Sequence, residues 1–178
     1  MEYLIEVMPQ LLVGALTTLK LFLFTLIGSL PLGIVLALGL SLHFKPLRYL
    51  LQTYVWVMRG TPLLLQLIFI FYGLPTIGIV FDRFEAALIA FILNYAAYFA
   101  EIFRGGIQSI PQGQYEAAQV LQLSPFQTVT KIVIPQVTKI VLPSVGNEVI
   151  NLVKDSSLIY ILGLGEDRKS TRLNSSHQ

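Results

Sequence analysis

The sequence predicts an all-α protein, a polytopic bundle of membrane-spanning helices. Of its 178 residues, 54% are hydrophobic and 12% are charged, and the mean hydropathy is +0.71. Soluble domains carry about 25% charged residues, so this composition favours a membrane protein. The apolar residues also gather in runs near the ~20 residues that a helix needs to cross the hydrocarbon core. A net charge of +2 is too small to indicate nucleic acid, and the chain has no cysteine for disulfides or thiolate chemistry.

Four apolar segments are predicted to cross the membrane. In chain order they are 11–40, 60–81, 84–103 and 137–152. The first contains only one charge, Lys20, and continues from an acidic N-terminus that does not resemble a cleavable signal peptide. The fourth is the weakest, because Pro143 and Glu148 interrupt it.

The segment 109–136 is too polar to span a membrane, and we predict two short helices in it. Ser124 begins a capping-box pattern, with proline next and Gln127 three residues later. Pro135 is predicted to end the second helix. Two capped helices between apolar segments would present a surface that a partner protein grips. The alternative is a plain soluble helical hairpin.

The basic residues predict the orientation of the chain. Lysine and arginine concentrate on the cytoplasmic side of membrane proteins. One side of the predicted bundle carries Lys45, Arg48, Arg59, Arg104, Lys131 and Lys139. The other side carries Arg83, while Lys20 and Lys154 lie at span ends and are ambiguous. The distribution predicts a cytoplasmic 116–135 loop and an N-terminus outside.

The loop also resembles a known family. The run Glu116-Ala117-Ala118, followed by Phe126 and Ile134-Pro135, resembles the EAA loop of bacterial ABC-importer permeases. In that family the loop forms coupling helices that dock on the ATPase subunits. One position departs from the family pattern, because the glycine six residues after the glutamate is Gln122 here. The resemblance implies an ATPase-coupling role for Glu116, Ala117, Ala118, Gln122, Phe126 and Pro135.

Three further stretches, 59–63, 94–106 and 154–158, resemble the polar amino-acid subgroup of these permeases, and the match extends from about 11 to 165. That subgroup imports histidine, arginine, lysine, glutamine, glutamate or opines. The resemblance implies a type I ABC importer permease fold in a bacterial cytoplasmic membrane, with four spans visible and an expected final span missing. It implies an ABC ATPase dimer, a second permease chain, identical or homologous, and an extracytoplasmic amino-acid-binding protein as partners. No cofactor is expected on this chain, since ATP and Mg²⁺ would bind the ATPase.

Polar residues within the spans are candidates for a substrate pathway. Asn94, Tyr98 and Glu101 share one helical face, and Glu148, Asn151 and Asp155 repeat at three- to four-residue spacing beside Lys154. An amino acid needs both acceptors and donors, which these residues would supply. The alternative is that they pair with one another or snorkel to the interface. We interpret Arg59-Gly60-Thr61-Pro62 as a bend and interface anchor rather than a ligand.

Enzyme and channel functions are weaker alternatives. The only histidines are His43 and His177, so neither a metal site nor a serine triad has its ligands or base. A near match to a phosphate-binding loop at 163–170 has Arg168 where the second glycine is needed. An integral-membrane enzyme would need a clustered base and nucleophile, and a passive channel would have no use for the 109–136 loop.

The character of the chain changes near Glu166. We predict a permease domain at 1–166, with its coupling loop at about 104–136. The remaining segment, 167–178, is polar and rich in Ser, Arg and Asn without periodicity. We interpret it as non-native sequence, with a disordered tail as the alternative.

Overall fold

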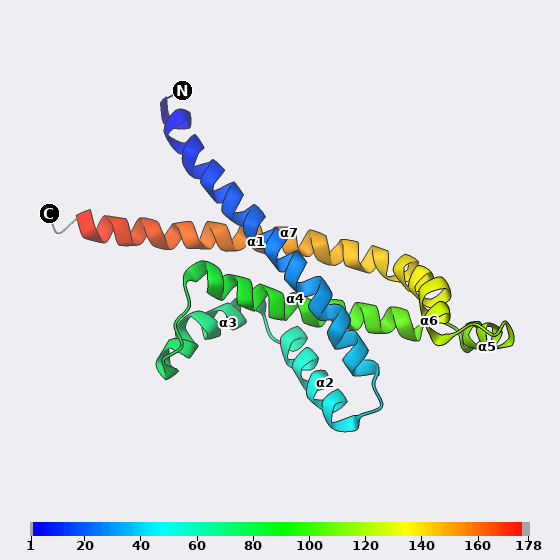
Figure 1. Ribbon diagram of the computed structural model, residues 1–178. Helices are drawn as coiled ribbons and strands as arrows, with labels where there is room; N and C mark the ends of the chain where they lie inside the picture. The colour runs from blue at the N-terminus through cyan, green and yellow to red at the C-terminus, as the bar shows by residue number, and fades with distance from the viewer. Residues whose placement is uncertain (1, 176–178) are drawn as a thin grey trace.

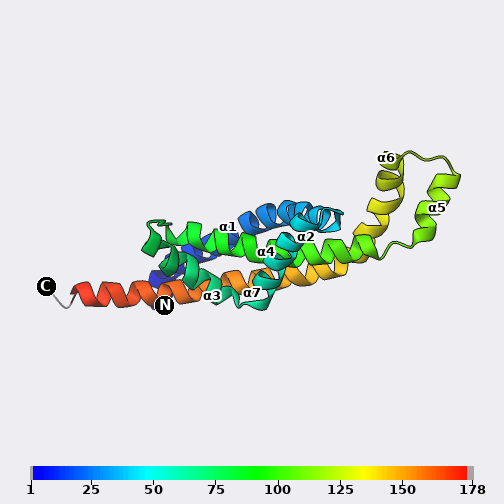
Figure 2. The same ribbon diagram turned by 90° about the horizontal axis from the view of Figure 1, so that it is seen from below.

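The computed structural model describes the backbone of residues 2–175, and within that range every regular element is a helix. Three long helices form the body (Figures 1 and 2): α1 (Glu2–Ser41), α4 (Arg83–Gln108) and α7 (Ile134–Ser175). The shorter α2 (Lys45–Gly60) and α3 (Leu63–Ile68) lie beside them. The helices α5 (Gln112–Val120) and α6 (Pro125–Thr128) project from one end of the long axis. The predicted all-α membrane bundle is confirmed.

Within the part of the chain that the structure describes, two helices are long and apolar enough to cross a membrane, α1 over Ile5–Ser41 and α4. They contain the first and third predicted spans. A third candidate is a broken pair, Lys45–Gly60 with Leu63–Ile77, which bends by 106°. The helix α7 covers the fourth predicted span and continues through Pro143. It is not among the candidates found in the described residues, and it carries Lys139, Glu148, Lys154 and Asp155.

The bend predicted at Arg59-Gly60-Thr61-Pro62 is confirmed, and it separates α2 from the helical part of the predicted 60–81 span, which begins at Leu63. Thr61 and Pro62 are extended, with ψ angles of 145° and 141°. The residue before a proline is pushed out of the helical region, so the chain must turn here. Beyond α3 the helix widens into a π-helix, Phe69–Gly73, and then tightens into a 3₁₀-helix, Leu74–Ile77. Gly78, with a φ of 88°, ends the run in a left-handed conformation that glycine adopts without strain.

Small residues let α1 and α4 approach closely. Thr25, Ser29, Gly33 and Ala37 recur at four-residue spacing on α1, and all four are buried. A Cβ on Gly33 would lie 2.6 Å from the Cβ of Phe99 and 3.3 Å from the backbone oxygen of Ala96. In a membrane, helices associate by packing and not by hydrophobic exclusion, so such small-residue stripes are where backbones meet.

The main core is aromatic and lies where α1, α4 and α7 cross. Phe91, Tyr95 and Phe99 follow one face of α4, and they contact Leu21 of α1 and Leu152 of α7. This crossing fixes α7 against α4 close to the residues that line the pocket described below. Beyond it α7 continues as backbone helix to Ser175, while 176–178 lie outside the described residues. The interpretation of 167–178 as non-native or disordered stays a prediction.

Candidate functional site

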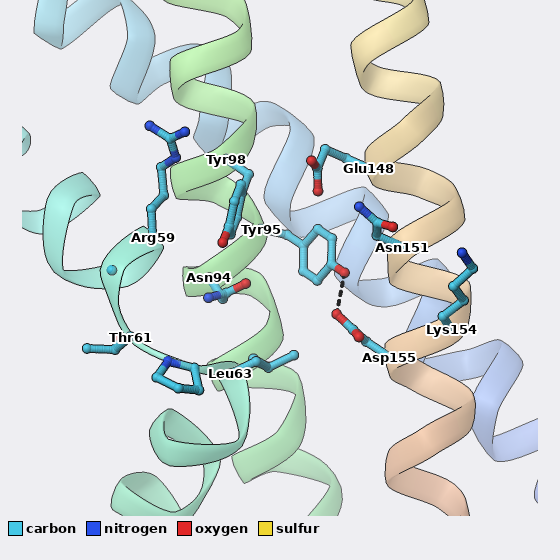
Figure 3. A pocket seen from close by; sticks show the side chains of 12 residues that line it. Arg59, Thr61, Leu63, Asn94, Tyr95, Tyr98, Glu148, Asn151, Lys154 and Asp155 are labelled. Carbon is cyan, nitrogen blue, oxygen red and sulfur yellow. Dashed lines mark hydrogen bonds between the residues drawn. The ribbon is translucent and has the colours of Figure 1, made fainter.

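A cavity of about 550 Å³ opens between the α2–α3 break, α4 and α7 (Figure 3). Its polar walls come from segments far apart in the sequence. The break contributes Arg59 and Thr61, α4 contributes Asn94, Tyr95 and Tyr98, and α7 contributes Glu148, Asn151, Lys154 and Asp155. Two apolar residues of the break, Pro62 and Leu63, also line the cavity. A polar cavity beside a discontinuous helix is a common design for membrane substrate sites.

Helical periodicity explains why these side chains converge. On α4, Asn94 and Tyr98 are one turn apart, and on α7 Glu148, Asn151 and Asp155 occupy successive turns of one face. Six of the seven residues predicted for a substrate pathway line the cavity: Asn94, Tyr98, Glu148, Asn151, Lys154 and Asp155. Their role in binding a substrate stays a prediction.

Glu101 lies elsewhere. It lines a second cavity, of about 430 Å³, between α2 and α4. One carboxylate oxygen accepts a hydrogen bond from Arg104 at 3.2 Å, and the other lies 3.9 Å from Arg59. In this structure Glu101 therefore pairs with neighbouring arginines, which was the alternative to a role in the substrate pathway. Arg59 lines both cavities, and its guanidinium lies 5.5 Å from the centre of the Tyr98 ring.

Asp155 is held in place by a residue that the sequence pattern did not single out. The hydroxyl of Tyr95, which is 2% exposed, donates to Oδ2 of Asp155 at 2.6 Å (Figure 3). A hydrogen bond to an ionised acceptor is among the strong ones, and here it joins α4 to α7 across the cavity. Tyr95 lies in the 94–106 stretch that resembles the permease subgroup, but helical spacing did not place it with Asn94, Tyr98 and Glu101.

The charges in the cavity are mixed. Glu148 and Asp155 supply acceptors, while Lys154 and Arg59 supply donors, and all four line the cavity. Such a set can engage a ligand that carries both an ammonium and a carboxylate group. Among the described residues, no three His, Asp or Glu side chains are grouped so as to hold a metal ion.

The second feature of interest is the 109–136 loop, which forms the two predicted helices. The α5 helix ends in a Schellman motif: the Gln122 N–H donates to Gln119 O at 2.9 Å and the Leu123 N–H to Ala118 O at 3.0 Å. Gln122 itself has a φ of 56°. This left-handed position is where the resembled family has glycine, so the conformation explains the family pattern.

The capping box at Ser124 is confirmed. Gln127 N–H donates to Ser124 Oγ at 3.2 Å, and Ser124 N–H donates to Gln127 Oε1 at 3.0 Å. The prediction that Pro135 ends this helix is wrong. A π-helix over Val129–Val133 leads directly into α7, with Ile134 N–H bonded to Val129 O. The wider turn relieves the clash that a proline ring makes with the preceding carbonyl, so the helical path continues.

The loop presents apolar side chains outward. Val120, Leu121 and Phe126 are 82%, 69% and 76% exposed. Of the six residues with an implied coupling role, Glu116, Ala117, Gln122, Phe126 and Pro135 are exposed, whereas Ala118 is buried at 1%. Large apolar side chains exposed together mark an interaction surface, and the coupling role of these residues stays a prediction.

Taken together, a helical membrane bundle, a polar cavity beside a broken span and a loop with exposed apolar side chains at one end define a membrane transport component. The family described as "Binding-protein-dependent transport system inner membrane component" matches residues 29–176. The chain belongs to this family, and it is a permease component of an ABC transport system.

Individual relatives agree with this assignment. The chain is 40% identical over 159 residues to the arginine transport system permease protein of Bacillus subtilis (strain 168), covering 89% of this chain and 73% of that protein. It is 41% identical over 166 residues to a putative glutamine transport system permease protein of Rickettsia bellii (strain RML369-C), covering 91% and 76%. A crystal structure of an amino acid ABC transporter with histidines matches with a TM-score of 0.81, 35% identity and coverage of 90% and 75%.

Proposed function

We propose that this permease subunit moves a polar amino acid inward across the bacterial cytoplasmic membrane. The observation that carries the proposal is the mixed-charge cavity. Asp155 and Glu148 can accept from an ammonium group, while Lys154 can donate to a carboxylate from the same helix. The names of the relatives, arginine and glutamine permeases, support a polar amino acid as the class of substrate.

The energy for transport enters through the loop. The exposed side chains of Val120 and Phe126 suit a groove on a separate ABC ATPase, where ATP and Mg²⁺ bind. The concentration of basic residues on the loop side supports a cytoplasmic loop and an N-terminus outside. An extracytoplasmic binding protein delivers the amino acid, and a second permease chain, identical or homologous, completes the assembly.

The transport cycle follows from this arrangement. Closure of the ATPase pair draws the two loops together and favours an outward-facing bundle, into which the binding protein releases its amino acid. Hydrolysis resets the bundle to the inward-facing state. Each ligand acts by favouring one state of the same bundle, which is the thermodynamic requirement for coupling.

The test is uptake by proteoliposomes that contain the permease chain and its ATPase, with the binding protein outside. Radiolabelled arginine, glutamine, histidine and glutamate are supplied with the binding protein, and ATP is sealed inside. We expect uptake of at least one of them against its gradient only when ATP is present. Flux that is equal with and without ATP would indicate a channel and contradict the proposal.

A further inference from the structure

The broken span leaves backbone groups that need hydrogen-bond partners. Carbonyls in the last turn of α2 lack N–H donors from a following helical turn, because the helix ends at Gly60. At membrane depth an unsatisfied backbone group costs several kcal/mol, so a break persists only where other groups satisfy it. The partner here is Gln66 of α3. Its Nε2 donates to Met58 O at 3.0 Å and to Thr61 Oγ1 at 2.8 Å.

A second amide ties this arrangement to α4. Asn94 is 4% exposed, and its Nδ2 donates to Met58 O at 3.1 Å and to Gln66 Oε1 at 3.2 Å. Met58 O therefore accepts from both side chains. Both hydrogens of the Asn94 amide nitrogen are engaged, so this nitrogen is occupied in holding the backbone rather than free for a ligand.

These contacts bear on the shape of the cavity. The break from Arg59 to Leu63 forms one wall, and Asn94, Tyr95 and Tyr98 of α4 form the wall beside it (Figure 3). The Asn94 amide joins α4 to both Met58 O and Gln66, and the Tyr54 hydroxyl of α2 donates to Leu93 O beside it. A change in the side chains that make these hydrogen bonds would move one wall of the cavity relative to the other, without altering the charged residues of α7.

We propose that Gln66 and Asn94 are positioning residues, an amide clamp that sets the spacing between the broken span and α4 and thereby the substrate selectivity of the cavity. The proposal rests on the proposed function, since it assigns a selectivity role within that same site. It predicts a specific kinetic signature. Losing the clamp widens the cavity, so the KM rises and discrimination among amino acids falls while the turnover of bound substrate persists.

The test compares Gln66→Met and Asn94→Leu, which keep approximate size and remove the amides, in the reconstituted transporter. Gln66→Met removes four hydrogen bonds and Asn94→Leu removes two. We expect the KM for uptake to rise about tenfold in each, with kcat within about twofold. The ratio of kcat/KM between the preferred amino acid and a smaller or larger one should fall by a similar factor. The double variant should be little worse than either single variant, because the two amides act as one unit.

Asn147→Leu is the matched control. Asn147 is exposed on α7 and does not line the cavity, so the same substitution there should leave KM and selectivity unchanged. Gln66→Glu is a milder variant that keeps the acceptor for Asn94 and loses the donors to Met58 and Thr61. Its KM should lie between those of the wild type and the apolar variants. If the apolar variants fail to assemble, this variant still tests the clamp.

Two results would overturn the clamp. One is unchanged KM and selectivity in Gln66→Glu or in the apolar variants. The other is a purely structural effect, in which the amount of assembled transporter falls while KM and selectivity stay as in the wild type. Failure of the wild-type complex to transport any amino acid is a different outcome, which would contradict the proposed function itself.

Discussion

Asp155 is a cavity carboxylate whose position is set by a hydrogen bond from another helix. Its carboxylate faces the cavity and accepts the Tyr95 hydroxyl at 2.6 Å, so it is oriented by α4 although it belongs to α7. A carboxylate held in this way is suited to bind an ammonium group, because its position is set before the substrate arrives.

Asp155→Asn tests that assignment. The variant keeps the size of the side chain and removes its charge, so we expect the KM for uptake to rise at least about tenfold, as a charge-assisted hydrogen bond is lost. Tyr95→Phe is the companion variant, which keeps the charge and removes only the orienting hydroxyl, and its KM should rise less. A wild-type KM in the Asp155→Asn transporter would show that Asp155 does not bind the substrate.

Gln122 offers a prediction about the loop. Its φ of 56° strains any side chain, and glycine adopts this conformation freely. Gln122→Gly should therefore stabilise the loop by about 1 kcal/mol, which a thermal unfolding or proteolysis assay of the loop would detect. The control is Gln119→Gly, three residues earlier within α5, where glycine should destabilise by about 1 kcal/mol. Equal effects of the two changes would contradict the conformational argument.

At the scale of single residues, the sequence predicted which side chains share a helical face, but not which side chains of other helices they contact. Helical spacing placed Glu148, Asn151 and Asp155 on one face, and the structure brings them into one cavity with Asn94. The roles of Tyr95 and Gln66 were missed because their partners lie 60 and 28 residues away. Helical periodicity describes one helix at a time, so it does not predict which face of one helix packs against which face of another.

At the scale of elements, capping and proline patterns in the sequence predicted where helices begin better than where they end. The capping box at Ser124 and the turn after α5 formed where side-chain and backbone donors required them. The bend at 59–62 formed as predicted, whereas the predicted stop at Pro135 was wrong. At Pro62 the tertiary structure supplies partners for a broken helix, and before Pro135 a π-turn removes the need for a break.

The packing of α1 on α4 gives a prediction for these elements. At Gly33 any side chain would collide with Phe99 and the α4 backbone, so Gly33→Leu should force the helices apart and destabilise the fold by about 1–3 kcal/mol or more. Gly146→Leu is the control, since a Cβ there meets no atom within 4 Å. Thermal unfolding in detergent measures both. Similar losses at the two positions would contradict close packing as the cause.

At the scale of the whole molecule, the loop and the cavity are joined by the same two helices. The loop connects the end of α4 at Gln108 to the start of α7 at Ile134. These helices carry Asn94, Tyr98, Glu148 and Asp155 into the cavity, and they lie side by side in both views (Figures 1 and 2). A partner that moves the loop therefore acts directly on two walls of the cavity, which is the physical content of the coupling that we propose.

The most direct test of this account uses the absence of cysteine from the chain. Val120, 82% exposed on the loop, is replaced by cysteine, whereas Ala118 would be a poor choice because it is buried. Membrane-impermeant maleimide is applied from each side, and a short cross-linker joins the cysteine to the ATPase. We predict labelling only from the cytoplasmic side and a cross-link whose yield changes when ATP binds. Labelling from outside would contradict the orientation and, with it, the route by which ATP drives transport.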